Sequence, residues 1–346
     1  MDVLKPHLEW IGNICYRVNP LNLGNYTTAH ETSYMEPDVE TYCLEATDDD
    51  VECVTVDDNG RCRASFHVPQ AYFAYIIGAK GGTKRNIEQS TKTQIMIPKQ
   101  GKDGDIVVTG SSKRDVASAR TRILMMVKGA RSRKKPTHFI SIPLTHDTFK
   151  RNFLKFKSSV LENCPDRGVV ESVFINENKL HITVVLFVIC DETERRETAE
   201  ALRKCKETVI GPVLQGRPLK LKMEGLDYMN DDPSEVNVLF ANVVGEDSSL
   251  LQKLVDGIMD FFGDLAPTKQ EPRKSVKIHA TLMNTVYSSN NEDTKTTFDA
   301  SNILKLYSDY SFGEAVVDKI DMSIIHTVCP KTGYYNATES IDLNYF

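Results

Sequence analysis

The pattern of hydrophobic and polar residues divides the chain into three parts. The first part, up to about residue 58, shows little apolar periodicity apart from two short apolar runs at 8–11 and 14–16. These runs could dock on a partner, dock on the chain's own fold, or form a terminal strand that packs locally. The second part alternates short strand patterns with helical patterns. Its expected strands are 61–68, 93–97 and 106–109, and its expected helices are 70–77, 83–90 and 113–128.

The third part of the chain alternates strands and helices up to the C-terminus. The patterns predict strands at 139–144, 179–189, 219–223, 236–244, 276–283, 315–325 and 338–343, and helices at 148–164, 191–206 and 248–262. A long segment that mixes strands with amphipathic helices predicts an α+β domain with its own hydrophobic core.

Charge follows the same division. The net charge of the chain is −6, yet residues 18–60 hold 11 acidic residues without any Lys or Arg, whereas residues 61–136 hold 17 Lys and Arg against four acidic residues. A segment this basic attracts phosphate backbones, although charge alone is equally consistent with a solvated surface. We therefore expect four segments: an acidic, largely disordered one at 1–58, a basic domain at 59–130, a basic linker at 131–136 and a larger domain at 137–346.

Composition narrows the class of protein. The chain is 40% hydrophobic and 26% charged, as globular proteins are, and no apolar run is long enough to predict a membrane span or a secretory signal. The eight cysteines never form C-x-x-C, which favours reduced thiols over a disulfide framework or a zinc site. P-loop, zinc-protease and serine-hydrolase motifs are absent, so we expect neither a metal nor a cofactor.

A glycine loop joins the first two expected helices of the basic domain. A helix that begins without obstructing side chains lets a nucleic-acid backbone approach its free N–H groups. The loop and the order strand-helix-helix-strand-strand-helix resemble a type I KH domain, whose G-x-x-G loop contacts about four nucleotides. The resemblance implies binding of single-stranded RNA, with single-stranded DNA left open and a degenerate scaffold domain as the alternative. The expected contact residues are Ile77, Gly78, Ala79, Lys80, Gly81, Lys84 and Arg85.

One pattern, K-φ-H-x-T-φ with φ apolar, occurs twice in the C-terminal part, at 179–184 and 277–282. On a strand, alternate side chains share a face, so each histidine projects together with its threonine. Two imidazoles and two hydroxyls around one anion suit phosphoester cleavage. Imidazole acts as base or acid near neutral pH, and hydroxyls donate to phosphate oxygens. The candidate catalytic residues are His181, Thr183, His279 and Thr281.

Two other H-x-T triplets begin at His30 and His146, without apolar residues on both sides, and we attribute them to chance. The first lies in the acidic segment and the second at an expected helix start. Asp232, beside Pro233, is expected in a turn rather than a metal site. His138 and His326 are expected to be structural.

The paired motifs resemble the 2H phosphoesterase, or LigT-like, superfamily. The resemblance implies a bilobal fold with two pseudo-symmetric antiparallel sheets around a cleft, and metal-independent chemistry on RNA phosphoesters such as 2′,3′-cyclic phosphates or 3′ ends. The order of the two domains and the segment at 225–233 also resemble a subunit of a helicase-containing transcription-coactivator complex. That likeness implies a nuclear location, a role in repair of alkylated DNA, and a monomer within the complex. The alternative is a catalytically silent RNA-binding adaptor.

Overall fold

The computed structural model describes residues 7–11, 14–18, 51–57, 60–99, 104–263, 265, 267–269, 275–287 and 297–343. The chain divides into two units, 1–43 and 44–346. In the first unit, β1 (His7–Ile11) and β2 (Ile14–Val18) pair as an antiparallel hairpin, so the two apolar runs near the N-terminus form local strands. The disorder expected for 19–50 concerns residues outside the described part of the chain.

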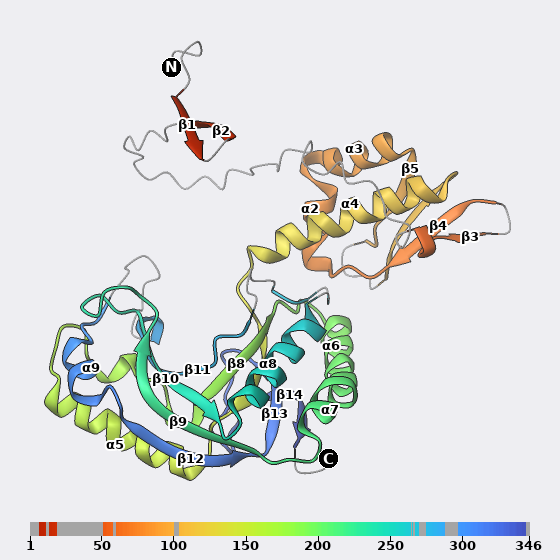
Figure 1. The fold of residues 1–346 in the computed structure, drawn as a ribbon. Coiled ribbons are helices and arrows are strands. Elements are labelled where there is room, and N and C mark those ends of the chain that lie inside the picture. The colour runs from red at the N-terminus through yellow and green to blue at the C-terminus, as the bar shows by residue number, and fades with distance from the viewer. Residues whose placement is uncertain are drawn as a thin grey trace. The chain divides into compact units, whose positions relative to one another are not determined.

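The basic part of the chain forms a small sheet covered by helices (Figure 1). Its strands are β3 (Thr55–Val56), β4 (Cys62–Phe66), β5 (Thr93–Met96) and β6 (Ile106–Gly110), and its helices are α2 (Phe73–Ile77), α3 (Gly82–Thr91) and α4 (Lys113–Ser132). The antiparallel sheet has the order β3-β4-β6-β5, and α2, α3 and α4 pack on it through a separate hydrophobic core. The order β-α-α-β-β-α predicted from the sequence is confirmed.

The expectation of disorder in the acidic segment is wrong for residues 51–57. Within this stretch, which the charge pattern places in the largely disordered segment, Thr55–Val56 form β3 of the small sheet. Thr55 pairs with Arg63 and Val56 with Cys62, and Val54 is only 3% exposed. The edge of β4 provides backbone hydrogen-bond partners for β3, and the Val54 side chain packs in the apolar core. These residues are therefore ordered despite their acidic neighbours.

The C-terminal part is built on one curved antiparallel sheet of eight strands (Figure 1). In spatial order the strands are β12 (Ser311–Val317), β9 (Leu219–Tyr228), β10 (Val238–Gly245), β11 (His279–Asn284), β8 (His181–Phe187), β7 (His138–Pro143), β13 (Lys319–Ile324) and β14 (Ala337–Asp342). Four strands lie on each side of the β11–β8 boundary, where only Ala280 and Ile182 pair. The bilobal α+β fold is confirmed, with its two four-stranded halves joined edge to edge.

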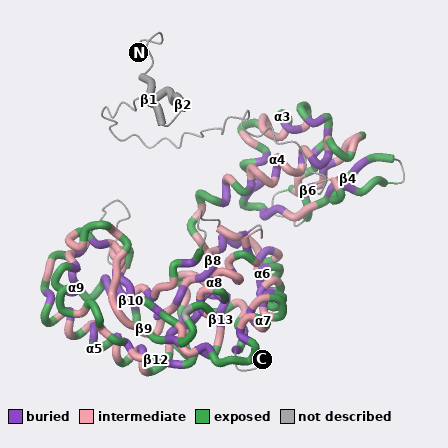
Figure 2. Tube along the Cα trace, in the orientation of Figure 1, coloured by how far each residue is buried: buried purple, intermediate pink, exposed green. Residues whose placement is uncertain are grey.

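The helices of this part pack against the sheet and bury its apolar face. They are α5 (Asp147–Asn163), α6 (Glu192–Cys205), α7 (Gly211–Leu214), α8 (Ser248–Phe262) and α9 (Ser301–Tyr307). Helix α8 contacts β8 and β10, and α5 contacts β12. Buried residues recur along β8, β10 and β13 (Figure 2). Leu180, Ile182, Ala280 and Leu282 are fully buried, so the apolar positions of both repeats face this core.

The strand predicted at 315–325 is wrong in one respect, because two strands occupy this stretch. Strand β12 ends at Val317 and pairs with β9 at one edge of the sheet, whereas β13 starts at Lys319 and pairs with β7 in the other half. Asp318 and Lys319 interrupt the apolar alternation, which moves from Ala315 and Val317 to Ile320 and Met322, and the chain crosses between the halves at this break. The short helices α7 and α9 were also not predicted.

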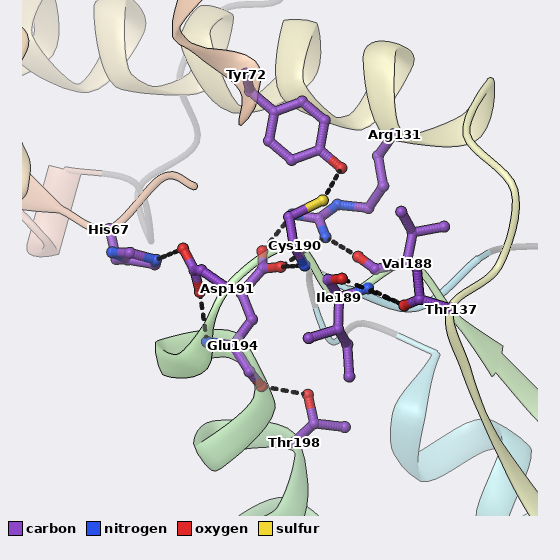
Figure 3. Close-up of polar contacts among 10 residues, drawn as sticks. All are labelled: His67, Tyr72, Arg131, Thr137, Val188, Ile189, Cys190, Asp191, Glu194 and Thr198. Carbon is purple, nitrogen blue, oxygen red and sulfur yellow. Dashed lines mark hydrogen bonds and ion pairs between the residues drawn. The ribbon is translucent and has the colours of Figure 1, made fainter. Parts of the chain in front are cut away.

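The small domain and the large sheet domain are joined by a buried ion pair at the end of α4 (Figure 3). The Arg131 guanidinium donates to both carboxylate oxygens of Glu194 on α6 and to the Val188 carbonyl. Arg131 and Glu194 are each only 4% exposed, and the guanidinium lies 4.9 Å from the centre of the Tyr72 ring. A bidentate pair of this kind fixes both position and orientation.

Two further contacts surround this ion pair (Figure 3). The Cys190 thiol donates to the Tyr72 hydroxyl over 3.2 Å, and His67 Nε2 lies 2.8 Å from Asp191 Oδ2. The other oxygen of Asp191 accepts the backbone N–H of Glu194 and so caps the start of α6. The segment between β8 and α6 therefore holds the end of α4 and the residues around Tyr72.

Candidate active site

The two repeated motifs lie on neighbouring strands at the centre of the large sheet. Strands β8 and β11 pair where Ile182 is opposite Ala280, and the two strands are antiparallel. Each histidine therefore lies beside the threonine of the other strand, at cross-strand distances of about 5 Å between Cβ atoms. Because the apolar neighbours face the core, the four polar side chains share the opposite face. These are His181, Thr183, His279 and Thr281.

Both imidazoles are held in the same way. The Nδ1 atom of His181 lies 2.7 Å from the Lys179 carbonyl oxygen, and that of His279 lies 2.7 Å from the Lys277 carbonyl oxygen. A carbonyl only accepts, so we assign the proton to Nδ1 in each ring, which leaves Nε2 as the basic nitrogen. The Nε2 atom of His181 accepts from the Thr183 hydroxyl over 3.1 Å.

The environment of His181 favours its neutral form. Burial is the largest effect and, with the nearby charges of His279 and Lys179, lowers the pKa of His181 to about 4, although the bond to the Lys179 carbonyl acts in the opposite direction. At neutral pH, His181 is therefore an uncharged imidazole that can accept a proton.

This shift makes a prediction that can be tested without a substrate. The folded protein should keep His181 neutral until the pH falls to about 4, whereas the unfolded chain binds that proton near 6.5. Because the unfolded state binds the proton first, the His181 contribution to the free energy of unfolding should decrease as the pH falls from about 6.5 to about 4. Nitrogen-15 NMR of the imidazole measures the midpoint. A midpoint near 6.5 in folded protein would contradict this assignment.

Aromatic rings that the sequence did not point to surround His181. Its ring centre lies 5.0 Å from that of Phe139 and 5.6 Å from that of Tyr335, which stands edge-on at 88°. The neighbouring Tyr334 donates through its hydroxyl to Ser141 on β7, over 2.9 Å. Both tyrosines come from the segment between β13 and β14. They are far from His181 along the chain, so the sequence did not indicate that they lie close to it.

The glycine loop of the small domain lies between α2 and α3. A Cβ at Gly78, whose φ is +69°, would lie 2.0 Å from Thr83 Oγ1, so only glycine fits there. Arg85 donates to the carbonyls of Lys80 and Gly81 over 2.6 and 3.2 Å and so holds the loop in place. Among the predicted RNA contacts, Arg85 therefore binds the backbone of the loop, and the other residues lie on the loop or beside it.

The remaining candidates have structural roles. His146 caps α5, where its Nδ1 accepts the backbone N–H of Thr148, and Asp232 accepts from Ser234 in a turn. Over the residues that the structure describes, no cluster of three or more His, Cys, Asp or Glu could hold a metal ion. In that same part of the chain, no helix is both long and apolar enough to cross a membrane.

Comparison with known proteins agrees with both parts of the fold. The AKAP7 2′5′ RNA ligase-like domain matches residues 136–343, and the KH domain matches residues 63–125. The chain therefore belongs to the AKAP7 2′5′ RNA ligase-like family, a group of 2H phosphoesterase type, and carries a KH domain ahead of that domain. It is 36% identical, over 99% of its length and 100% of the relative's, to activating signal cointegrator 1 complex subunit 1 of Mus musculus.

Two solved structures also resemble parts of the chain. The first KH type I domain of human vigilin is 24% identical with a TM-score of 0.21, covering 24% of this chain and 87% of the vigilin domain. The protein TT0787 of Thermus thermophilus is 16% identical with a TM-score of 0.38, covering 60% of this chain and 98% of TT0787.

Proposed function

We propose that the protein is an RNA-binding, metal-independent phosphodiesterase that acts on RNA phosphoesters, either 2′,3′-cyclic phosphates or 3′ ends. The observation that carries the proposal is the pairing of two H-x-T motifs on neighbouring strands. Both histidines present the same basic nitrogen, Nε2, because both Nδ1 atoms are held by carbonyls. Such a pair supplies the base and the acid that cleavage of a P–O bond needs.

The low pKa of His181 supports its assignment as the base. In this mechanism His181 Nε2 takes the proton from the attacking water or 2′-hydroxyl as the new P–O bond forms. His279, in its protonated form, gives a proton to the leaving oxygen as the other P–O bond breaks. The hydroxyls of Thr183 and Thr281 donate to the non-bridging oxygens, where negative charge develops. The overall charge of the site is conserved over the step.

In this proposal the KH domain binds single-stranded RNA and presents a phosphodiester to the two histidines. Likeness to a cointegrator subunit supports a further step, in which the chain works as a monomer within a helicase-containing activating signal cointegrator complex. A nuclear location and roles in transcription and in repair of alkylated DNA belong to the same proposal.

The activity is tested with 5′-labelled single-stranded RNA and a DNA of the same sequence, both in EDTA. The expected result is shortened or end-modified RNA, whereas DNA stays intact if the substrate's own 2′-hydroxyl attacks. Turnover that requires an added metal ion would contradict the mechanism. Absence of turnover with RNA binding retained would favour the adaptor alternative.

The KH assignment makes its own prediction. Changing Lys80 and Lys84 together to Asp should weaken RNA binding at least tenfold and reduce the slope of log affinity against log salt by about 1.4, since each lost phosphate contact on a single strand contributes about 0.7. Filter binding across a salt series measures both. The matched control is Lys155→Asp with Lys305→Asp, the same charge change at exposed positions of α5 and α9. Equal weakening by both pairs would contradict a KH-specific contact.

A further inference from the structure

Each repeat begins with a lysine whose ammonium lies near an aromatic ring, and this contact occurs in both halves of the sheet. The Lys179 ammonium lies 4.6 Å from the centre of the Tyr335 ring, and the Lys277 ammonium lies 4.5 Å from that of Phe240. Each of these rings also contacts the histidine of the same half, at 5.6 and 5.1 Å between ring centres. In both halves, the backbone carbonyl of the lysine therefore holds the histidine. The ammonium of the same lysine lies on an aromatic ring that also contacts that histidine.

The two lysines differ in their counter-charge. The Lys277 nitrogen lies 3.7 Å from Asp227 Oδ2, and the Lys277 side chain is 52% exposed. Among the described residues, no carboxylate lies within ion-pair distance of Lys179, and burial lowers the pKa of its ammonium. A partly desolvated cation without an anion is unfavourable, and an anionic ligand would complete it.

The surroundings of Lys179 are fixed before any ligand binds. Tyr335 stands at 83° to Tyr334, with 5.1 Å between ring centres, and Tyr334 is anchored to Ser141 by its hydroxyl. Tyr334 is only 3% exposed, so this anchor lies inside the protein. A cation supported by packed and hydrogen-bonded neighbours binds an anion with little loss of side-chain freedom.

We propose that Lys179 forms a second phosphate subsite on the His181 side of the site, with Tyr335 supporting its ammonium. This subsite binds a phosphate that flanks the reacting one, so the preferred ligand carries two phosphates on one nucleotide or on successive nucleotides. The identity of the reacting phosphate rests on the proposed phosphodiesterase function, whereas the preference for a ligand with two phosphates does not. Lys277, already paired with Asp227, provides no equivalent subsite, and this asymmetry gives the substrate a fixed direction.

The test compares two ligands that differ by one phosphate, adenosine 3′-monophosphate and adenosine 3′,5′-bisphosphate. Calorimetry on the full chain should show at least tenfold tighter binding of the bisphosphate. In Lys179→Met the ratio of the bisphosphate affinity to the monophosphate affinity should fall to about one. Lys179→Arg, which keeps the cation, should retain most of the wild-type ratio. Lys277→Met is the matched control and should keep the wild-type ratio, which also accounts for any nucleotide bound by the KH domain.

Two results would overturn the subsite: an unchanged ratio in Lys179→Met, or an equal loss in Lys277→Met. Turnover of a cyclic phosphate, measured on the same proteins, separates this inference from the proposed function. A ratio that depends on Lys179 in a chain without turnover supports the subsite and contradicts the phosphodiesterase. Turnover together with an affinity ratio that Lys179→Met leaves unchanged overturns the subsite and supports the phosphodiesterase.

Discussion

Replacing either His181 or His279 by alanine is expected to lower kcat/KM for RNA phosphoester cleavage by about 10²- to 10⁴-fold, the usual contribution of a positioned acid or base. Both side chains project from the face of the sheet opposite the fully buried Ile182 and Ala280, so the substitutions remove the imidazoles and leave the main hydrophobic core in place. Initial rates on RNA ending in a 2′,3′-cyclic phosphate measure the effect.

The control for this prediction is His146→Ala. It alters a triplet of the same H-x-T form, but His146 caps α5 and does not belong to the two-histidine site. Its kcat/KM should match that of the wild type. If His146→Ala reduced the rate as strongly as His181→Ala, the loss would reflect general damage rather than lost chemistry.

The second large effect concerns the junction between the KH domain and the sheet domain. Arg131→Ala should lower the free energy of unfolding by about 3–5 kcal/mol, because it leaves Glu194 as an unpaired carboxylate inside the protein. The substitution also removes the donor to the Val188 carbonyl and the cation that packs on Tyr72. Urea unfolding followed by circular dichroism measures the change.

Two further variants decide whether burial is the cause. Arg203→Ala breaks a pair with Glu339 in which the arginine side chain is 52% exposed, and it should cost about 1 kcal/mol or less. Arg131→Met combined with Glu194→Leu removes both charges and should recover most of the loss. Equal effects of Arg131→Ala and Arg203→Ala would contradict the importance of the buried pair.

Most of the KH fold could be predicted because its elements are short and clearly bounded. Pro69 and Pro98 follow strand patterns directly, and the glycine loop separates two helical patterns. The sequence failed where long-range partners decide the outcome. Val54 is ordered by a core formed by distant residues. The break in the alternation at Asp318 and Lys319 is a crossover between sheet halves rather than an irregularity within one strand, and only the strand partners show this.

The four H-x-T side chains could also be predicted, since a repeated pattern with period two fixes which side chains share a face. The pattern K-φ-H-x-T-φ already contained Lys179 and Lys277, but their unequal counter-charges depend on Asp227, which lies in a different strand. Tyr335 could not be found, because its contact with His181 arises from the path of the chain between β13 and β14. The proposal that His181 is the base likewise rests on burial, which the sequence does not report.

In the proposed mechanism, His181 and His279 act together on one phosphate. The direct test is the rate of opening of an RNA 2′,3′-cyclic phosphate in EDTA for the wild type, the two single alanine variants and the double variant. Residues that act as a unit have non-additive effects, so the double variant should be about as slow as the slower single variant. No turnover by the wild type, or single effects that multiply in the double variant, would contradict the claim.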